Sequence, residues 1–432
     1  MVWADLDGEL KFVVIKEKLL GRTWTEDGKM QEYLREQVDW PQAFPEEEYG
    51  QRLAKVRRAL KAAGLDAIYV THPANVTYLT GYDMIWNHLR SVTGVLVSAD
   101  SDATVFFDER AHTTIVYTTP EIREIVWLDD SSDLEPVEVI ARELDARGFG
   151  KAAIGIEKWG YSPHASVVDA LEGRIQALGA RVVDATALVE DIRFVKSPLE
   201  VVHVRKAAAI ADEAMAAARD AIRPGITETE LEGVIMGTMM KAGGGYPGIR
   251  TMVASGPRAG THHSPPTRRQ VKPGDLVFID FCGCYDRYHV NLNRTFALGE
   301  PDPRWTKLMD DSAGCIDAIV AEISSGDPLS KADEIGNAYI DAAGLRKYVW
   351  WVGGYSLGIA QPPDWCGRHW LKPIEEGTER DFEPGVVVNF ENQFDVWEKW
   401  PGGSGVAYVD SLLMTDAGLE VLSTLPRNLV VV

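Results

Sequence analysis

Cysteine is scarce in this sequence, which has four cysteines, Cys282, Cys284, Cys315 and Cys366, in 432 residues. So low a density excludes a small disulfide scaffold and is typical of a protein that folds in a reducing compartment. We therefore expect a cytoplasmic location. Cys282 and Cys284 are spaced C-x-C inside an apolar run, with no other thiol near them in sequence, and we expect core packing rather than metal binding there.

Basic residues are few compared with acidic ones. Lysine and arginine number 44 against 65 aspartates and glutamates, which gives a formal net charge of −21. A surface this negative repels phosphate backbones and anionic lipid headgroups. The composition therefore argues against nucleic acid and membranes as partners.

Long apolar runs are also lacking. No stretch approaches the ~20 residues that a membrane-spanning helix needs, and the start, MVWADLDGELKFVVIKEK, is acidic where a signal peptide requires a basic flank. We expect neither a membrane span nor export. With 45% hydrophobic and 25% charged residues, the composition is that of a folded protein, and the length predicts two domains.

The first half of the chain alternates helical and strand patterns. A helical pattern from Glu46 ends at Gly64, and the strand-like segment DAIYVTH follows it. The short strand patterns GVLVSA, ATVFFD and KAAIGIE are mixed with the helical patterns VEVIARELDARG and SVVDALEGRIQALG. This alternation predicts an α/β domain over residues 46–192, preceded by an extension of unknown role over residues 1–45.

The second half has a different pattern. Pro198 can occupy the first turn of a long alanine-rich helix that stops at Pro224 and Gly225, and Thr227 with an acid three residues later has the pattern of a capping box. Strand patterns follow at GDLVFIDFCGCY, RTFALG, PGVVVNF and YVDSLLMT. These features predict an antiparallel α+β domain over residues 193–432.

Polar residues with catalytic potential occur in two stretches of this second half. In THHSPPTRRQVKPGD, two prolines after His263 favour an extended loop that holds the imidazole for general acid–base chemistry. In LVFIDFCGCYDRYHVNLNRTFALG, Asp280 closes an apolar run, and a buried carboxylate is costly unless it is paired or used. The alternatives are a hydrogen-bonding surface histidine and a buried salt bridge from Asp280 to Arg294.

Two further stretches add an acid and an aromatic wall. Glycines in GGYSLGIAQPPDWCGRHW permit close backbone approach, and Tyr355 and Trp365 provide aromatic surfaces. Glu391 ends another hydrophobic strand, in EPGVVVNFENQFDVW. We expect most tryptophans of this region in the core, and one or two lining a site for a small cationic or planar ligand. They are Trp350, Trp351, Trp365, Trp370, Trp397 and Trp400.

From about residue 46 to its end, the chain resembles the creatinase, methionine aminopeptidase and prolidase superfamily. Six landmarks occur in the superfamily's order: KSPLEVVHVRKAAAIAD, HSPPTRRQVKPGD, Asp280 with NRTF, the glycine turn, PGVVVNFE and GVAYVDSLLMTDAG. The resemblance implies an α/β N-terminal domain plus an α+β pita-bread catalytic domain. It also implies a homodimer with sites near the subunit interface.

The same resemblance implies that the metal site of the superfamily is lost. Metal-dependent members hold two divalent ions with two aspartates, one histidine and two glutamates. The matching positions in this chain are Asp280, Asn291, Tyr355, Glu391 and Val409. Three of the five ligands are replaced, and valine cannot coordinate an ion. We therefore expect no metal and no other cofactor.

Two metal-free members, creatinase and ectoine hydrolase, are the better comparison. The loop around His263 resembles the creatinase segment with its catalytic histidine, but Asn293 stands where creatinase has a glutamate. Resemblance to ectoine hydrolase is carried by the R-Y-H of residues 287–289 and by the GYxxGIxxPPDW turn of residues 354–365. The chain departs from that pattern at Glu391, where ectoine hydrolase is expected to lack the acid.

These resemblances imply a metal-independent hydrolase that cleaves a C–N bond of a small non-peptide amidine, guanidine or amide. His263 is the expected general base and then acid, while Glu391 and Asp280 hold or protonate the nitrogen side. Trp86, His88 and Arg90 belong to a loop that reaches a partner subunit in this superfamily. With them, the expected substrate-binding residues are Tyr355, Tyr288, His289, Arg294 and Trp365.

Two alternatives remain open. An Xaa-Pro-type metallopeptidase or a metal-dependent lyase needs a rearranged site, with ligands among Asp280, Glu391, Asp286, His289 and Asp410. A catalytically inactive peptidase-like module would bind peptides or proteins without turnover, and the presence of His263 argues against it.

Overall fold

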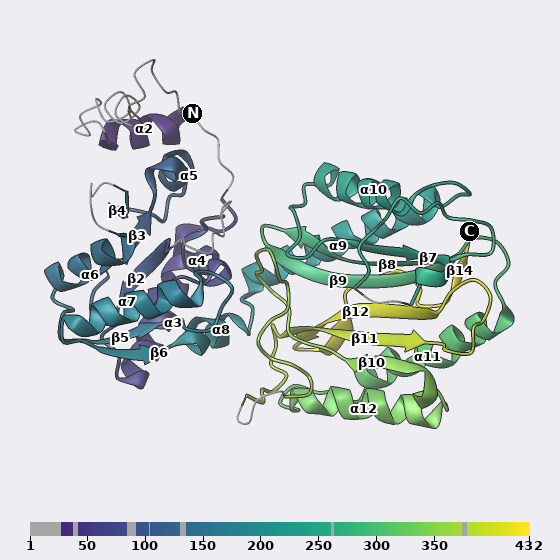
Figure 1. The fold of residues 1–432 in the computed structure, drawn as a ribbon. Coiled ribbons are helices and arrows are strands. Elements are labelled where there is room, and N and C mark those ends of the chain that lie inside the picture. The colour runs from purple at the N-terminus through teal and green to yellow at the C-terminus, as the bar shows by residue number, and fades with distance from the viewer. Residues whose placement is uncertain are drawn as a thin grey trace, which may run out of the picture.

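The chain folds into two domains, on the left and right of Figure 1. The structure is a computed structural model that describes residues 27–37, 42–83, 92–102, 104–129, 135–260, 263–373 and 378–432. No helix in these ranges is long and apolar enough to cross a membrane. The expected α/β N-terminal domain and pita-bread domain are both present.

The N-terminal domain is built on a six-stranded sheet with the order β4-β3-β2-β1-β5-β6. The strands are β1 (Ala67–Val70), β2 (Gly94–Ser98), β3 (Thr104–Asp108), β4 (Glu124–Trp127), β5 (Ala153–Ile156) and β6 (Arg181–Asp184). Strand β1 pairs parallel with β5 and antiparallel with β2. The pattern of the sequence predicted β1, β2, β3 and β5, but not the edge strands β4 and β6.

Helices cover both faces of this sheet. They are α3 (Glu46–Ala63), α4 (Pro73–Thr80), α5 (Thr113–Thr118), α6 (Pro136–Ala146), α7 (Ala165–Ala177) and α8 (Thr186–Arg193), with a 3-10 turn over Arg110–His112. Alternate residues of β1 pack against α6 and α7 on one face and against α3 on the other. The predicted end of the first helix is confirmed, because Gly64 caps α3 with φ 64°. The extension contains a helix that was not predicted, α2 (Asp27–Gln37).

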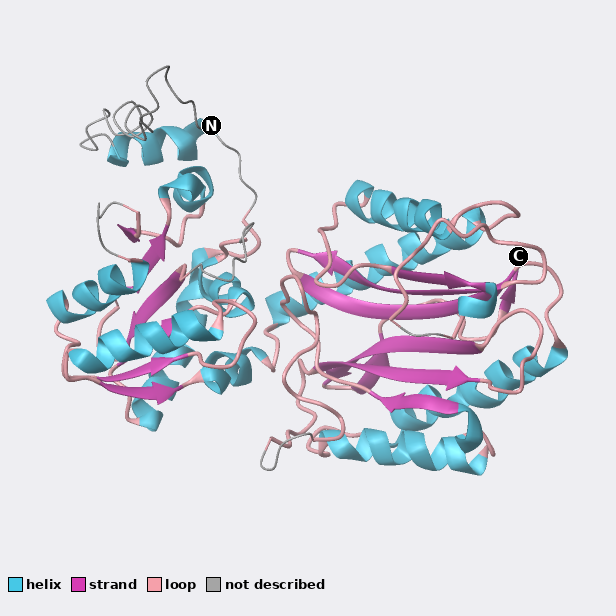
Figure 2. Cartoon of the chain, viewed as in Figure 1, coloured by secondary structure: helices cyan, strands magenta, loops and turns pink. Residues whose placement is uncertain are grey.

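The catalytic domain is built on an eight-stranded sheet. Six of its strands follow the order β10-β11-β12-β9-β8-β7, while β13 pairs with β12 and β14 pairs with β9. Figure 2 shows these strands between two pairs of helices, α9 with α10 and α11 with α12. The helices are α9 (Pro198–Ala221), α10 (Glu228–Lys241), α11 (Pro303–Glu322) and α12 (Leu329–Ala342), with 3-10 turns over Gly256–Arg258 and Arg346–Tyr348. The strands are β7 (Met252–Ser255), β8 (Leu276–Tyr285), β9 (Tyr288–Ala297), β10 (Val349–Gly353), β11 (Val387–Asp395), β12 (Gly405–Thr415), β13 (Gly418–Val421) and β14 (Val430–Val431).

The starts of α9 and α10 follow the sequence signals. Pro198 occupies the first turn of α9, whose N-cap Ser197 forms a capping box with Glu200. The predicted capping box of Thr227 is confirmed, with Glu230 as its partner. Both helices therefore begin where their side chains satisfy the free backbone N–H groups.

Successive side chains of strand β8 point alternately to the two faces of the sheet. Its residues Val277, Ile279 and Phe281 pack into a cluster with α9 and α10, so the side chain of Asp280 points to the other face of the sheet. Helix α9 crosses β8 closely at Gly283, where an added Cβ would lie 2.2 Å from a backbone oxygen of the helix. Cys282 and Cys284 are both buried, in line with the core packing expected for them.

Candidate active site

A single row of residues crosses the curved sheet of the catalytic domain. The strand register pairs each member of the row with the next one, and paired residues on adjacent strands share a face of the sheet. From β10 to β7 the row consists of Gly353, Glu391, Val409, Asn293, Asp280 and Met252. Both acids predicted from the sequence therefore lie on one face, with Val409 and Asn293 between them.

This face forms the floor of a cavity of about 530 Å³, the active cavity. The cavity brings together five residues predicted from distant stretches of sequence, namely His263, Asp280, Glu391, Tyr355 and Trp365. The rest of its lining is mostly apolar and aromatic. It consists of Ile249, Arg250, Thr251, Met252, Pro265, Trp350, Trp351, Pro363, Cys366, Trp370 and Gln393.

Asp280 is held inside the sheet with one amide donor. Its side chain is buried, and Nδ2 of Asn291 donates to Oδ1 at 2.8 Å. Burial raises the pKa of Asp280 from 3.8 to about 7, because water is removed from the charged form, while the hydrogen bond from Asn291 opposes the rise. The carboxyl group therefore changes charge near neutral pH. The suggested salt bridge to Arg294 is wrong, because Arg294 pairs with Asp410 instead.

Glu391 lies in the middle of β11, not at its end, and both of its oxygens accept hydrogen bonds. Nδ2 of Asn389 donates to Oε1 at 2.7 Å, and Nε2 of Gln393 donates to Oε2 at 2.8 Å. Burial, and after it the negative charge of Asp280, raises the pKa of Glu391 from 4.5 to about 8. The two acids therefore retain at least one proton between them at neutral pH.

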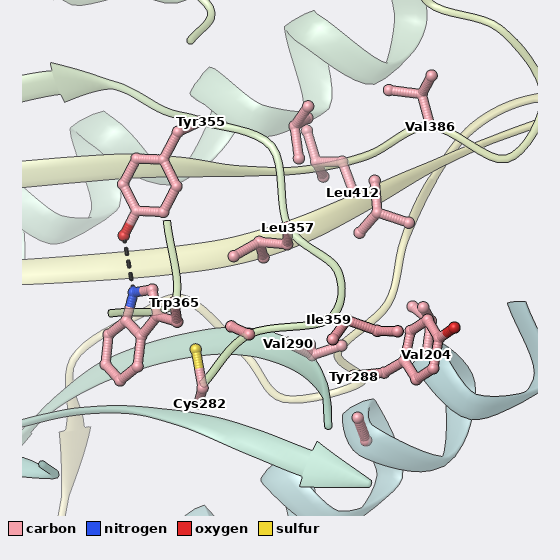
Figure 3. Packing of buried hydrophobic residues seen from close by; sticks show 14 of the residues in the cluster. Val204, Cys282, Tyr288, Val290, Tyr355, Leu357, Ile359, Trp365, Val386 and Leu412 are labelled. Atoms are coloured by element: carbon pink, nitrogen blue, oxygen red, sulfur yellow. Dashed lines mark hydrogen bonds between the residues drawn. The ribbon is translucent and has the colours of Figure 1, made fainter. Parts of the chain in front are cut away.

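Tyr355 and Trp365, whose polar atoms meet in Figure 3, both line the active cavity. The indole N–H of Trp365 donates to the hydroxyl of Tyr355 at 3.0 Å, and the backbone N–H of Tyr355 donates to Oδ1 of Asn389 at 2.8 Å. Burial, and then the charge of Glu391, raises the pKa of Tyr355 well above its usual value. The phenol thus keeps its proton and can donate it in a hydrogen bond.

His263 stands at the mouth of the active cavity and is exposed. Its ring meets the edge of Trp350, with ring centroids 5.8 Å apart and planes at 87°. The backbone of His263 has φ 59°, a left-handed conformation that is uncommon for residues other than glycine and is found disproportionately at functional sites. The imidazole therefore packs against the indole of Trp350 on one side and is accessible to water on the other.

Sequence reasoning missed two amides of this site, Asn389 and Gln393. They flank Glu391 by two residues on either side, and strand alternation places such residues on the same face. The alternation rule, applied outwards from Glu391, could have found both.

Of the tryptophans of this region, Trp350, Trp351, Trp365 and Trp370 line the cavity, whereas Trp397 is 86% exposed and Trp400 packs on Trp305.

Tyr288 does not line the active cavity, which corrects its assignment as a substrate contact. Its hydroxyl donates to Oε1 of Glu200 at 2.8 Å and accepts from Nη2 of Arg52 at 3.2 Å. Arg52 belongs to α3 and also donates to Glu48. Tyr288 is therefore part of a buried polar network that joins the two domains.

His289 is likewise a structural residue. Its Nδ1–H donates to the carbonyl of Arg287 at 2.7 Å, and its Nε2 accepts from the backbone N–H of Gly248 at 2.9 Å. Burial, and then the charge of Arg287, lowers the pKa of His289 to about 4, so the ring stays neutral. The ring fixes the segment before β7, from which Ile249 lines the active cavity.

Arg294 projects from the face of β9 opposite to the row. Residue 293 belongs to the row, and successive side chains of a strand point to opposite faces. Nη2 of Arg294 donates to Oδ1 of Asp410 at 2.7 Å, and its other N–H groups bind backbone carbonyls, including those of Leu425 and Pro426. All three assignments, Tyr288, His289 and Arg294, fail because sequence proximity does not fix the direction of a side chain.

The remaining predictions concern a loop of the N-terminal domain and two aspartates. Trp86, His88 and Arg90 lie outside the described residues. Asp286, at the turn between β8 and β9, lies 3.1 Å from Nδ1 of His203, and Asp410 is bound to Arg294. The ligand set suggested for a rearranged metal site is therefore not assembled.

The residues at the ligand positions of the superfamily do not fit the dinuclear site of its metal-dependent members. Val409 fills one ligand position with an alkyl group, and Asn291 uses its amide to bind Asp280. Both oxygens of Glu391 already accept amide N–H groups. Within the ranges that the structure describes, no three histidine, cysteine, aspartate or glutamate side chains form a group that could hold a metal ion.

Two family descriptions match the chain, one for each domain. Residues 202–416 match metallopeptidase family M24, and residues 52–195 match the creatinase/prolidase N-terminal domain. Ectoine hydrolase from Halomonas elongata is 28% identical over 422 residues, covering 91% of this chain and 99% of that protein.

Solved structures of similar architecture span nearly the whole chain. The Xaa-Pro dipeptidase from Bacillus anthracis superposes with a TM-score of 0.72 at 25% identity, covering 89% of this chain and 100% of the other. A prolidase from Thermococcus sibiricus superposes with a TM-score of 0.76 at 20% identity, covering 89% and 99%. These likenesses establish the two-domain fold.

Proposed function

Since this chain belongs to the creatinase/prolidase superfamily, we propose that it is a hydrolase that cleaves a C–N bond of a small non-peptide amidine, guanidine or amide without a metal ion. The observation that best supports the proposal is the row across the sheet. Two acids with raised pKa remain in it, Glu391 and Asp280, and Val409 and Asn293 stand between them. Such a floor can bind a cation that carries N–H groups, but it lacks the donors for a pair of metal ions.

The floor presents mainly acceptors to a ligand. The amides of Asn291, Asn389 and Gln393 already donate to the acids or to neighbouring oxygens. Oε1 of Gln393 is buried and has no partner, so it can accept an N–H from a ligand. Trp350, Trp351 and Trp370 add aromatic faces, which attract planar cations. An amidinium or guanidinium group satisfies both features.

The proposed reaction starts with attack of water on the amidine, guanidine or amide carbon. His263 removes a proton from this water as its oxygen bonds to carbon, and the electron pair of the C=N or C=O bond moves to the heteroatom. The electron pair on the heteroatom then re-forms the C=N or C=O bond as the scissile C–N bond breaks, and the pair of the broken bond stays on the departing nitrogen. Protonated Glu391 or the imidazolium of His263 gives that nitrogen a proton, while ionised Asp280 stabilises the cationic side.

A second candidate, an Xaa-Pro-type metallopeptidase, is favoured by the likeness to prolidases. The donor set of the row argues against it, because a dinuclear centre needs more than two carboxylates. The likeness to ectoine hydrolase instead supports a non-peptide substrate.

The test is turnover of ectoine, hydroxyectoine, creatine and an Xaa-Pro dipeptide, each with and without a chelator. We expect hydrolysis of a non-peptide C–N bond that resists the chelator and falls by about 10²–10⁴-fold in His263→Ala. Trp397→Ala serves as the matched control, because its side chain is exposed and lies away from the active cavity. Dipeptide cleavage that requires added metal would overturn the proposal in favour of the peptidase.

A further inference from the structure

A second cavity, the inter-domain cavity, lies between the two domains. Its volume of about 530 Å³ equals that of the active cavity. The N-terminal domain contributes the start of α4, the loop after β5 and α8, and the catalytic domain contributes residues 359–370 and Thr378. The lining consists of His72, Ala74, Trp159, Gly160, Tyr161, Glu190, Arg193, Ile359, Ala360, Gln361, Asp364, Cys366, Gly367, Arg368, Trp370 and Thr378.

One loop separates this cavity from the active cavity. Cys366 and Trp370 line both of them, while Trp365 faces the active cavity and Asp364 faces the inter-domain cavity. A molecule in the inter-domain cavity would therefore contact the back of the loop that carries Trp365. Binding in the inter-domain cavity would therefore be coupled to substrate binding through that loop.

The inter-domain cavity contains a buried acceptor that no protein group satisfies. Gln361 is 1% exposed. Its Nε2 donates to Oγ1 of Thr77 at 3.1 Å and to Oδ1 of Asp83 at 3.0 Å. These two bonds fix the orientation of the amide and leave Oε1 without a partner. A buried carbonyl without a donor is costly, so this atom calls for a ligand N–H.

A second unpartnered atom belongs to the part of the lining that the N-terminal domain contributes. Nδ1 of His72 is buried and has no hydrogen-bond partner, and its ring meets the edge of Tyr161 with centroids 5.4 Å apart. Burial, and then the charge of Arg193, lowers the pKa of His72 to about 3. The imidazole is therefore neutral and provides a polar atom for a ligand without adding charge.

The charges of the lining balance one another. Arg193 and Glu190 form an ion pair within α8, with Nη2 3.3 Å from Oε1, and Arg368 and Asp364 add one further charge of each sign to the lining. The guanidinium of Arg193 already donates to Oδ1 of Asn75 at 2.7 Å and to the carbonyl of Ile359 at 2.6 Å. A ligand that carries one charge would pair with either the basic or the acidic side chains of this lining, but not with both. A zwitterion can pair with both.

We propose that the inter-domain cavity is a second small-molecule site, which binds a small zwitterion that carries N–H donors. The N–H groups bond to Oε1 of Gln361 and lie beside the acidic side chains, and the carboxylate lies towards Arg368. Trp159 and Tyr161 cover the apolar part of the ligand. The site stands independently of the reaction proposed for the active cavity.

Titration calorimetry of the full chain tests this site, with His263→Ala as the background so that no probe is consumed. Ectoine and creatine are probes that are zwitterions with N–H groups, and glycine betaine is a zwitterion without any N–H. We expect two sites per chain for at least one of the first two probes, and no binding of glycine betaine in the inter-domain cavity.

The variant Trp159→Ala assigns the second site. Its side chain is 76% exposed, so its removal leaves the fold intact, and we expect the affinity of one of the two sites to fall at least tenfold. Gln361→Met, which removes the buried acceptor, should weaken the same site. Trp397→Ala is the matched control and should leave both sites unchanged.

No binding of either N–H probe, or binding that neither Trp159→Ala nor Gln361→Met weakens, whether at one site or at two, would overturn the proposal. Failure of the proposed reaction gives a different result, because it appears as absent turnover in the wild type while binding sensitive to Trp159→Ala persists.

Discussion

Replacing Glu391 by glutamine tests whether the two acids of the active cavity carry a proton in the folded protein. Folding raises the pKa of Glu391 from 4.5 to about 8 and that of Asp280 from 3.8 to about 7. An acid with a raised pKa binds its proton more tightly in the folded state. The free energy of unfolding is therefore greatest below the ordinary pKa and decreases as the pH rises towards the folded value.

The size of the effect follows from these pKa values. Between its two pKa values, each acid lowers the free energy of unfolding by about 1.4 kcal/mol per pH unit, so the pair removes on the order of 5 kcal/mol from pH 5 to pH 7. Glu391→Gln abolishes one of the two contributions. We therefore expect the variant to lose only about half as much stability over this range, and to be more stable than the wild type at pH 8.

The amide group that Glu391→Gln introduces can be accommodated in the site. Gln393 donates to Oε2 of Glu391 at 2.8 Å, and its own Oε1 has no partner. Rotation of the Gln393 amide turns that oxygen towards the introduced NH₂ group, so the substitution need not leave two donors facing each other.

The assay is urea unfolding at a series of pH values, followed by near-ultraviolet absorbance and by tryptophan fluorescence. Glu420→Gln is the control, because Glu420 pairs with Arg205 on the surface and has a lowered pKa. Equal pH dependence in the wild type and in Glu391→Gln would refute the raised pKa, and with it the acid pair as a proton donor. Loss of activity alone would not decide the question.

Four other predictions concern binding and packing. A cationic substrate that binds between Asp280 and Glu391 should make the acid pair release a proton to the buffer below pH 8. Calorimetry in two buffers with different ionisation enthalpies should then give different binding enthalpies. Equal binding enthalpies would contradict a shared proton. Arg294→Met leaves Asp410 buried beside Arg427 alone and should lower the free energy of unfolding by about 3–5 kcal/mol in urea titrations, whereas an effect below about 1 kcal/mol would contradict the pair. Trp365→Phe removes the donor to Tyr355 and should raise KM about fivefold, through about 1 kcal/mol, with the melting temperature nearly unchanged. Gly354→Ala would place a Cβ 2.0 Å from the backbone oxygen of Asn389, so it should lower the free energy of unfolding by about 1–3 kcal/mol and reduce activity. Gly233→Ala is the control: its position in α10 has open space around it, so it should not destabilise the protein.

Much of the fold was available from the sequence, because its signals are local. The end of α3 at Gly64, the capping box of Thr227 and the first turn of α9 at Pro198 depend on neighbouring residues alone. Long apolar strands such as β8 were equally clear. The edge strands β4 and β6 were not predicted, because they are short and only partly buried, so their sequences lack the clear apolar runs of the central strands.

The residue types of the active cavity were also available. A carboxylate within an apolar strand requires a reason, and that argument selected Asp280 and Glu391. The prolines after His263 and the aromatic surfaces of Tyr355 and Trp365 singled out those residues, the landmarks of the superfamily supported them, and all three line the cavity.

Only the tertiary structure decided which side chains meet. Arg294 neighbours a residue of the row, yet it points to the opposite face and binds Asp410, because side-chain direction alternates along a strand. Tyr288 joins the domains because α3 places Arg52 beside it. The raised pKa of Glu391 depends on burial and on Asp280, which lies 111 positions earlier in the chain and three strands away in the sheet. Sequence thus determined which groups are present, and packing determined their partners, their charges and the cavity between the domains.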